Sequence, residues 1–84
     1  MPTISVFYGI TIVLRLKNKE HNPPHLHAFY GGYSAVFSIE TGEMIEGLFT
    51  KKGEKLVKEF ILKYQNELLE MWATNVFKQL PGLE

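Results

Sequence analysis

Residues 25–39, HLHAFYGGYSAVFSI, contain the strongest fold signal in this chain. Two runs of alternating polarity flank Gly31-Gly32, a pair that permits positive φ at both positions of a two-residue hairpin turn. The apolar face of this predicted hairpin comprises Leu26, Ala28, Tyr30, Ala35, Phe37 and Ile39. The segment therefore predicts an antiparallel hairpin with one face in the core.

The sequence on either side extends this hairpin into a meander. Residues 10–17 alternate in the same way, and a second turn at Thr41-Gly42 leads into another strand at 44–48. The inward positions of the 10–17 strand are Ile10, Ile12, Leu14 and Leu16. We predict a four- or five-stranded antiparallel sheet over residues 1–49.

The hydrophobic period changes from two to about 3.6 residues after Thr50. Apolar residues recur at helical spacing as far as Leu80, and Thr50 is a suitable N-cap. The polar residues near 64–66 leave two alternatives open, one long helix or two helices with a bend. We predict a single α+β domain over residues 1–84, in which the helical segment 50–80 packs on one face of the sheet.

Composition restricts the function further. The 84 residues include no cysteine, which excludes thiolate nucleophiles and cysteine-ligated zinc. Nine Lys and Arg residues balance nine Asp and Glu residues, which argues against nucleic-acid binding by bulk charge. No run approaches the roughly 18 apolar residues of a membrane span. We expect a cytoplasmic domain that makes no membrane contact.

All three histidines, His21, His25 and His27, lie within residues 21–27 beside a stiff Pro23-Pro24 pair. His25 and His27 project from one face of the predicted strand, where they could act as catalytic residues or share a divalent metal such as zinc, manganese or iron. His21 would be the third ligand. The alternatives for that ligand are Glu40 and Glu43 from the next hairpin. A purely structural role, with histidines bonded to loop carbonyls, also remains open.

Two further sets of residues suggest binding surfaces. The predicted outward positions of three adjacent strands are Val13, Arg15 and Lys17, then His25, His27 and Phe29, then Ser34, Val36 and Ser38. With His21 from the adjoining loop, this mixture of cations, imidazoles and one aromatic ring suits a protein partner or an RNA base and phosphate. A second group, Lys51, Lys52 and Lys55, begins the helix and suits an anion. The alternative for these lysines is neutralisation by the acidic hairpin that contains Glu40, Glu43 and Glu46.

Several motifs also carry a resemblance to a known family. They are MPTIS (1–5), FYGI (7–10), HNPPHLH (21–27), YG (30–31) and IETGEMIEG (39–47). Together they resemble the prokaryotic domain-of-unknown-function family 4160. The resemblance implies a component of small two-gene modules that look like toxin–antitoxin pairs. Many members of that family carry an acidic residue at the position of Phe29, so this chain departs from the family on the strand that carries the histidines.

Two functional hypotheses follow. The first is a small interaction domain in a toxin–antitoxin-like pair, which binds a partner protein or forms a homodimer, and which also contacts nucleic acid. The second is a metal- or histidine-dependent phosphodiester hydrolase, similar to a ribonuclease, that uses His21, His25 and His27.

Overall fold

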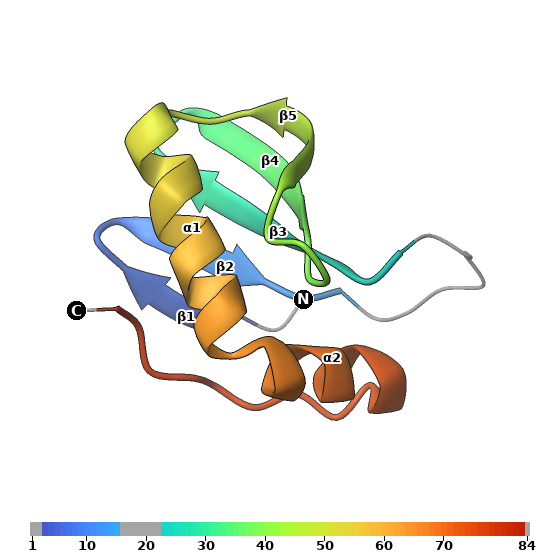
Figure 1. Ribbon diagram of the computed structural model, residues 1–84. Helices are drawn as coiled ribbons and strands as arrows, with labels where there is room; N and C mark the ends of the chain where they lie inside the picture. Colours follow the sequence, from blue (N-terminus) through green and yellow to red (C-terminus); the bar gives the residue numbers. More distant parts are fainter. Residues whose placement is uncertain (1–2, 16–22, 84) are drawn as a thin grey trace.

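The computed structural model describes residues 3–15 and 23–83, which form one antiparallel sheet followed by two helices (Figure 1). The strands are β1 (Thr3–Phe7), β2 (Ile10–Val13), β3 (His25–Tyr30), β4 (Tyr33–Ser38) and β5 (Met44–Leu48). The helices are α1 (Lys51–Lys63) and α2 (Gln65–Thr74). The sheet order is β1-β2-β3-β4-β5, so every strand pairs with its neighbour in sequence. The predicted α+β fold is confirmed, with five strands.

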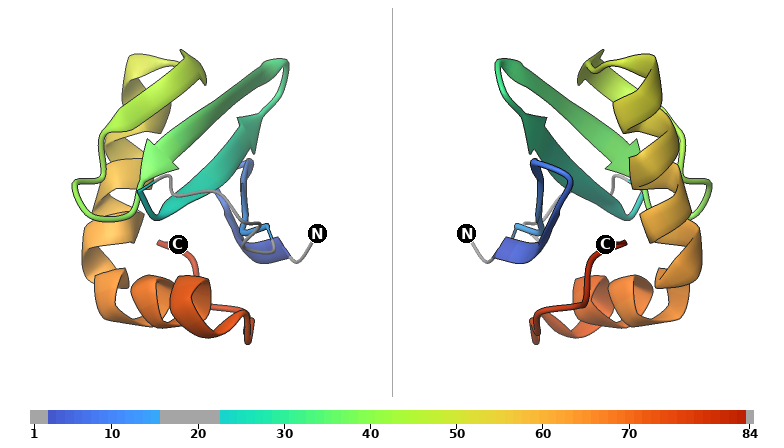
Figure 2. Two further views of the ribbon diagram at one scale, coloured as in Figure 1. Left: turned by 90° about the vertical axis from the view of Figure 1, so that its right-hand side faces the viewer. Right: turned by 90° about the vertical axis from the view of Figure 1, so that its left-hand side faces the viewer.

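The core lies between the sheet and α1, which crosses one face of the sheet (Figure 2). The predicted inward residues that are buried there are Ile10, Ile12, Leu14, Leu26, Ala28, Ala35, Phe37 and Ile39. Tyr30 differs from this prediction because it lies at the end of β3 and is exposed. Leu16 lies outside the described residues. Within the described chain, neither helix has the length and apolar character that a membrane crossing needs.

The β3–β4 hairpin forms at the predicted Gly31-Gly32 turn. Its register runs from His25 opposite Ser38 to Tyr30 opposite Tyr33. The β4–β5 pair contains a β-bulge, because Val36 lies opposite Glu46 whereas Phe37 lies opposite Met44. Ile45 is therefore the extra residue of the edge strand β5.

The helical segment is divided in two. Thr50 caps α1, because its Oγ1 accepts a hydrogen bond from the Gly53 amide at 3.0 Å. The second of the two helix alternatives is the observed one, since Tyr64 has φ −114° and separates α1 from α2. Gln65 stabilises this bend, because its Nε2 donates to the carbonyl oxygens of Ile39 at 3.0 Å and Glu40 at 2.8 Å.

The prediction that helix continues to Leu80 is wrong. α2 ends at Thr74 because Asn75 adopts the left-handed conformation, with φ 58°. The chain then returns to β1, where the Leu80 amide donates to the Ile4 carbonyl at 2.8 Å. Phe77 and Leu80 pack against the core from this non-helical segment. The three-residue spacing of Phe77 and Leu80 is also found in helices, but both residues lie in an irregular segment that returns to β1.

Candidate functional site

The outer face of the sheet, on the side opposite α1, carries two rows of side chains that cross all five strands. One row consists of Val6, Thr11, Phe29, Ser34 and Leu48. The next row consists of Thr3, Val13, His27, Val36 and Glu46. Because side chains alternate along each strand, all ten residues share this outer face. The prediction that His27 and Phe29 lie together with Val13, Ser34 and Val36 agrees with this register.

His25 and His27 lie next to each other on β3, with ring centroids 5.6 Å apart and ring planes at 70°. His25 Nδ1 lies 3.0 Å from the Pro23 carbonyl oxygen. Because a carbonyl oxygen only accepts, Nδ1 donates the proton of this hydrogen bond, and Nε2 takes no part in it. His25 thus has the structural role considered for the histidines, a hydrogen bond to a loop carbonyl. This bond leaves Nε2 of the ring for chemistry.

Trp72 of α2 extends this cluster. Its indole packs against the His25 ring, with 4.8 Å between centroids and 57° between planes. Both side chains are half-buried. The sequence contains no signal for this contact, because residues 25 and 72 are far apart in the chain and the bend at Tyr64 brings them together.

The electrostatic environment distinguishes His27 from an ordinary surface histidine. Burial lowers the pKa of His27 below 6.5, and the positive charges of Arg15 and His25 lower it further. Glu46 opposes this shift from its position in the same cross-strand row. His27 is therefore neutral at neutral pH, the state in which an imidazole accepts a proton or ligates a metal.

Glu43, one of the two acids considered as a third metal ligand, lies on the helix side of the sheet. The Glu43 carboxylate pairs with Lys58 of α1, so it faces the helix rather than the histidines. In residues 3–15 and 23–83, no three His, Asp or Glu side chains gather as a metal site. His21 and Lys17 lie outside this part of the chain, so the predicted set of His21, His25 and His27 stays a prediction.

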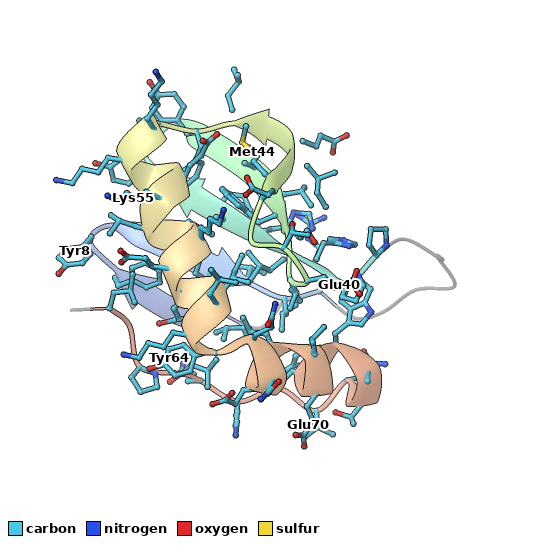
Figure 3. All side chains as sticks on the ribbon, in the orientation of Figure 1. Tyr8, Glu40, Met44, Lys55, Tyr64 and Glu70 are labelled. Atoms are coloured by element: carbon cyan, nitrogen blue, oxygen red, sulfur yellow. The ribbon has the colours of Figure 1, made fainter. Side chains whose placement is uncertain are left out.

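The predicted lysines lie on the helix layer. Lys51 and Lys55 line a shallow pocket of about 210 Å³ that also contacts Glu43 and Lys58. Figure 3 shows Lys55 on α1, well separated from Glu40 in the β4–β5 loop. Lys52 borders a different pocket. The structure therefore separates these three lysines from Arg15 and Phe29, and the Glu43–Lys58 pair supports partial neutralisation of the helix start.

These features define a small two-layer α+β domain, a five-stranded meander with a bent helical pair. A family model described as Domain of unknown function (DUF4160) matches residues 9–73, and the chain belongs to this family. The matched segment contains the outer-face histidines and Trp72. The comparisons with curated proteins and with solved structures found no match.

Proposed function

We propose that this protein is a cytoplasmic interaction domain, one component of a toxin–antitoxin-like two-gene module, and that its outer face binds a small partner protein. The observation that carries the proposal is the outer row that ends in two exposed aliphatic side chains. Val6 is 60% exposed at one edge of the sheet and Leu48 is 74% exposed at the other, with the Phe29 ring between them.

Burial of this row supplies a driving force for association. Covering the exposed parts of Val6 and Leu48 contributes on the order of 1–2 kcal/mol each. A stable interface buries about 800 Å² on each partner, which requires a face rather than single side chains. The five-stranded outer face has this form.

The partner contacts the face rather than extending the sheet. β5 is an edge strand, but the bulge at Ile45 and the positive φ of Gly47, 98°, interrupt the regular backbone spacing that another strand would need. Arg15 contributes positive charge near His27. We therefore expect a partner surface that is apolar at its centre and acidic opposite Arg15.

The test is coexpression with the product of the adjacent gene, which the two-gene proposal takes as the partner, followed by light scattering during size-exclusion chromatography. Val6→Glu and Leu48→Glu should abolish a heteromeric complex, whereas Leu62→Glu should preserve it. Leu62 is a matched control because it is 51% exposed on α1, in the other layer. Absence of a complex, or equal loss in the control, would overturn the proposal. A homodimer of the isolated chain that Val6→Glu disrupts would assign the face to a second copy instead.

Nucleic acid is a further partner that we propose for the same face. Phe29 and His27 share the outer face, and His27 lies near the cation Arg15, so this face offers an aromatic ring for a stacked base and a cation for a phosphate. Fluorescence anisotropy with labelled single-stranded RNA tests this point. Phe29→Ser should weaken RNA binding, and an unchanged affinity would remove nucleic acid from the proposal.

A second candidate function is phosphodiester hydrolysis, because His27 combines a lowered pKa with a neighbouring imidazole and a nearby guanidinium. In this mechanism His27 is the general base, His25 the general acid and Arg15 the phosphate ligand. A divalent metal on His21, His25 and His27 would instead polarise the phosphate. Cleavage of RNA by untagged protein, with and without added zinc, manganese or iron, tests both variants. The His27→Gln variant should lose the activity, and an inactive parent protein would eliminate this function.

A further inference from the structure

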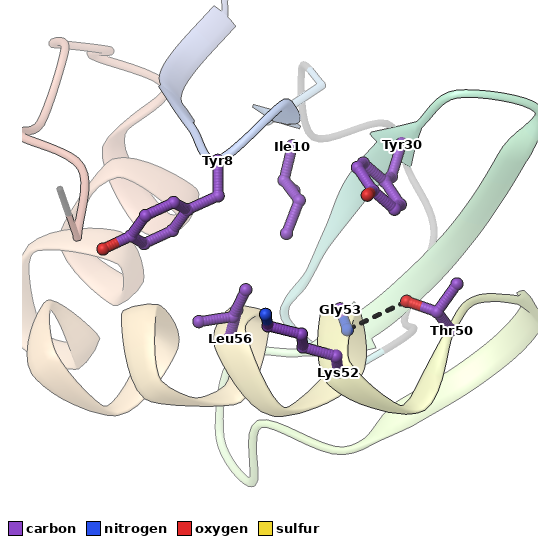
Figure 4. Close-up of a pocket in the computed structure, with 7 residues that line it drawn as sticks. All are labelled: Tyr8, Ile10, Tyr30, Thr50, Lys52, Gly53 and Leu56. Atoms are coloured by element: carbon purple, nitrogen blue, oxygen red, sulfur yellow. Dashed lines mark hydrogen bonds between the residues drawn. The ribbon is translucent and has the colours of Figure 1, made fainter.

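A pocket of about 370 Å³ lies on the helix side of the sheet, away from the outer face (Figure 4). It opens between the β1–β2 turn, the end of β3 and the first turns of α1. Its lining residues are Tyr8, Ile10, Tyr30, Thr50, Lys52, Gly53 and Leu56. This volume is near the lower end of the range for small-molecule sites, so it fits a compact ligand.

The walls of this tyrosine pocket are aromatic and aliphatic. Tyr8 and Tyr30 flank Ile10, which is buried, and Leu56 completes the apolar lining from α1 (Figure 4). Two neighbours pack against Tyr30. The centroids of the Tyr30 and Phe49 rings are 6.2 Å apart, and Gly9 lies so close that an added Cβ would be 3.3 Å from the Tyr30 ring. The pocket therefore has at least one fixed aromatic wall before any ligand arrives.

The backbone of Tyr8 is strained. Tyr8 has φ 48° and Gly9 has φ 79°, so both residues of the β1–β2 turn are left-handed. Asn, Asp or Gly occupies such a position without difficulty, whereas a tyrosine there costs on the order of 1–3 kcal/mol. A tyrosine in a backbone conformation this unfavourable indicates that its side chain has a role. The Tyr8 side chain borders the pocket.

The polar groups of the pocket indicate the charge of its ligand. Lys52 supplies a cation among the lining residues, and no lining residue is acidic. The Thr50 hydroxyl oxygen accepts a hydrogen bond from the Gly53 amide, so the helix cap already uses one of its two lone pairs. Two tyrosine rings suit a planar aromatic ring, and one lysine suits a single anionic group.

We propose that the tyrosine pocket binds a nucleotide, with the base against the tyrosine rings and the phosphate at Lys52. This ligand is either a free mononucleotide or the terminal nucleotide of a single-stranded RNA, because both present the same base and phosphate. The inference goes beyond partner binding and uses no residue of the outer face.

The experiment titrates the full chain with AMP, and separately with a short single-stranded RNA, and follows amide chemical shifts by NMR. The Lys52 and Gly53 amides should shift during the titration. The affinities are taken from the shifts of the Lys52 and Gly53 amides, because RNA bound to the outer face would not titrate these two signals. A similar affinity for the two probes at these amides assigns the site to the free nucleotide, and a higher affinity for RNA assigns it to the strand end. Absence of saturable shifts with both probes would overturn the proposal.

Two pairs of variants test the residues. Tyr8→Asn should weaken binding roughly tenfold or more while the unfolding midpoint stays level or rises, because Asn relieves the strained turn; Tyr8→Phe should retain most of the affinity. Lys52→Ala should weaken binding several-fold, whereas Lys55→Ala on the same helix should not. Equal affinity of Tyr8→Asn and parent protein contradicts the inference. Leu62→Glu, which lies outside both the pocket lining and the outer face, should leave AMP binding unchanged. The pocket and the outer face are tested through different residues, so the two proposals fail independently.

Discussion

The His25 imidazole lies against the Trp72 indole, with 4.8 Å between ring centroids, and so joins β3 to α2. The same imidazole bonds the Pro23 carbonyl through Nδ1. One side chain therefore fixes the entry to β3 and positions the second helix. Its half-buried setting differs from the exposed face that the sequence suggested for the histidines, so a substitution at His25 tests packing as well as chemistry.

The His25–Trp72 contact should stabilise the fold. Trp72→Ala should lower the free energy of unfolding by about 2 kcal/mol, because it removes a half-buried aromatic pair, whereas Trp72→Phe should lower it by much less. Urea denaturation followed by circular dichroism measures both values. Trp72 is the only tryptophan of the chain, so a shift of its fluorescence emission in His25→Ala reports the same contact. Unchanged emission would show that the two rings do not meet in solution.

His27 should make stability depend on pH. Its folded-state pKa lies below 6.5, so the unfolded chain takes up this proton more readily than the folded protein. The free energy of unfolding should therefore fall as the pH drops through 6.5, and this loss should level off below the folded pKa. Urea titrations between about pH 7 and about pH 5 measure the slope.

Two variants isolate this effect. His27→Gln should flatten the slope in that interval, because it removes the titrating group. Arg15→Gln should reduce the slope without removing it, since Arg15 contributes only part of the shift after burial. An NMR titration in which His27 protonates at or above 6.5 would contradict the assignment.

Gly47 should resist substitution in β5. It has φ 98°, and a Cβ there would collide with the Ser34 carbonyl oxygen and lie 2.7 Å from the Ala35 Cα. Gly47→Ala should destabilise the protein by on the order of 3 kcal/mol, from strain and overpacking together. Gly32→Ala is the control, because nothing lies within 4 Å of its added Cβ. Thermal unfolding that ranks the two variants equally would count against the described β5 bulge.

Asn75 should control where α2 ends. Its left-handed φ of 58° suits Asn or Gly, so Asn75→Gly should keep or raise stability, whereas Asn75→Val should lose about 1–2 kcal/mol. The measurement is the unfolding midpoint, with helical content read from circular dichroism. A gain of helix in Asn75→Val would instead indicate that helix can continue toward Leu80.

The part of the site that follows from the sequence is the part set by local turns. A two-residue turn at Gly31-Gly32 requires His27 to face Val36, and alternation then places Phe29 beside Ser34. Thr50 likewise begins α1 through its own hydroxyl. These features depend on neighbouring residues alone, so the fold class and the direction of the histidines could be predicted.

Other parts depend on contacts that a linear pattern does not contain. Regular alternation would place Ile45 opposite Val36, but the bulge moves Glu46 into that position and so brings an acid into the His27 row. The sequence does not reveal where α2 ends, because Phe77 and Leu80 keep a helical spacing although they lie in an irregular segment. The tyrosine pocket combines residues from three separate elements and leaves no motif.

The return of the chain to β1 has a consequence for synthesis. β1 precedes the other described strands in the sequence, yet its Ile4 carbonyl accepts a hydrogen bond from the amide of Leu80, which follows both helices. Gly82 also packs against Phe7, since a Cβ there would lie 2.6 Å from the Phe7 Cβ. Until the segment that contains Leu80 has left the ribosome and folded back, the edge of β1 is open to other chains. Closure of this edge therefore depends on residues that are synthesised after both helices.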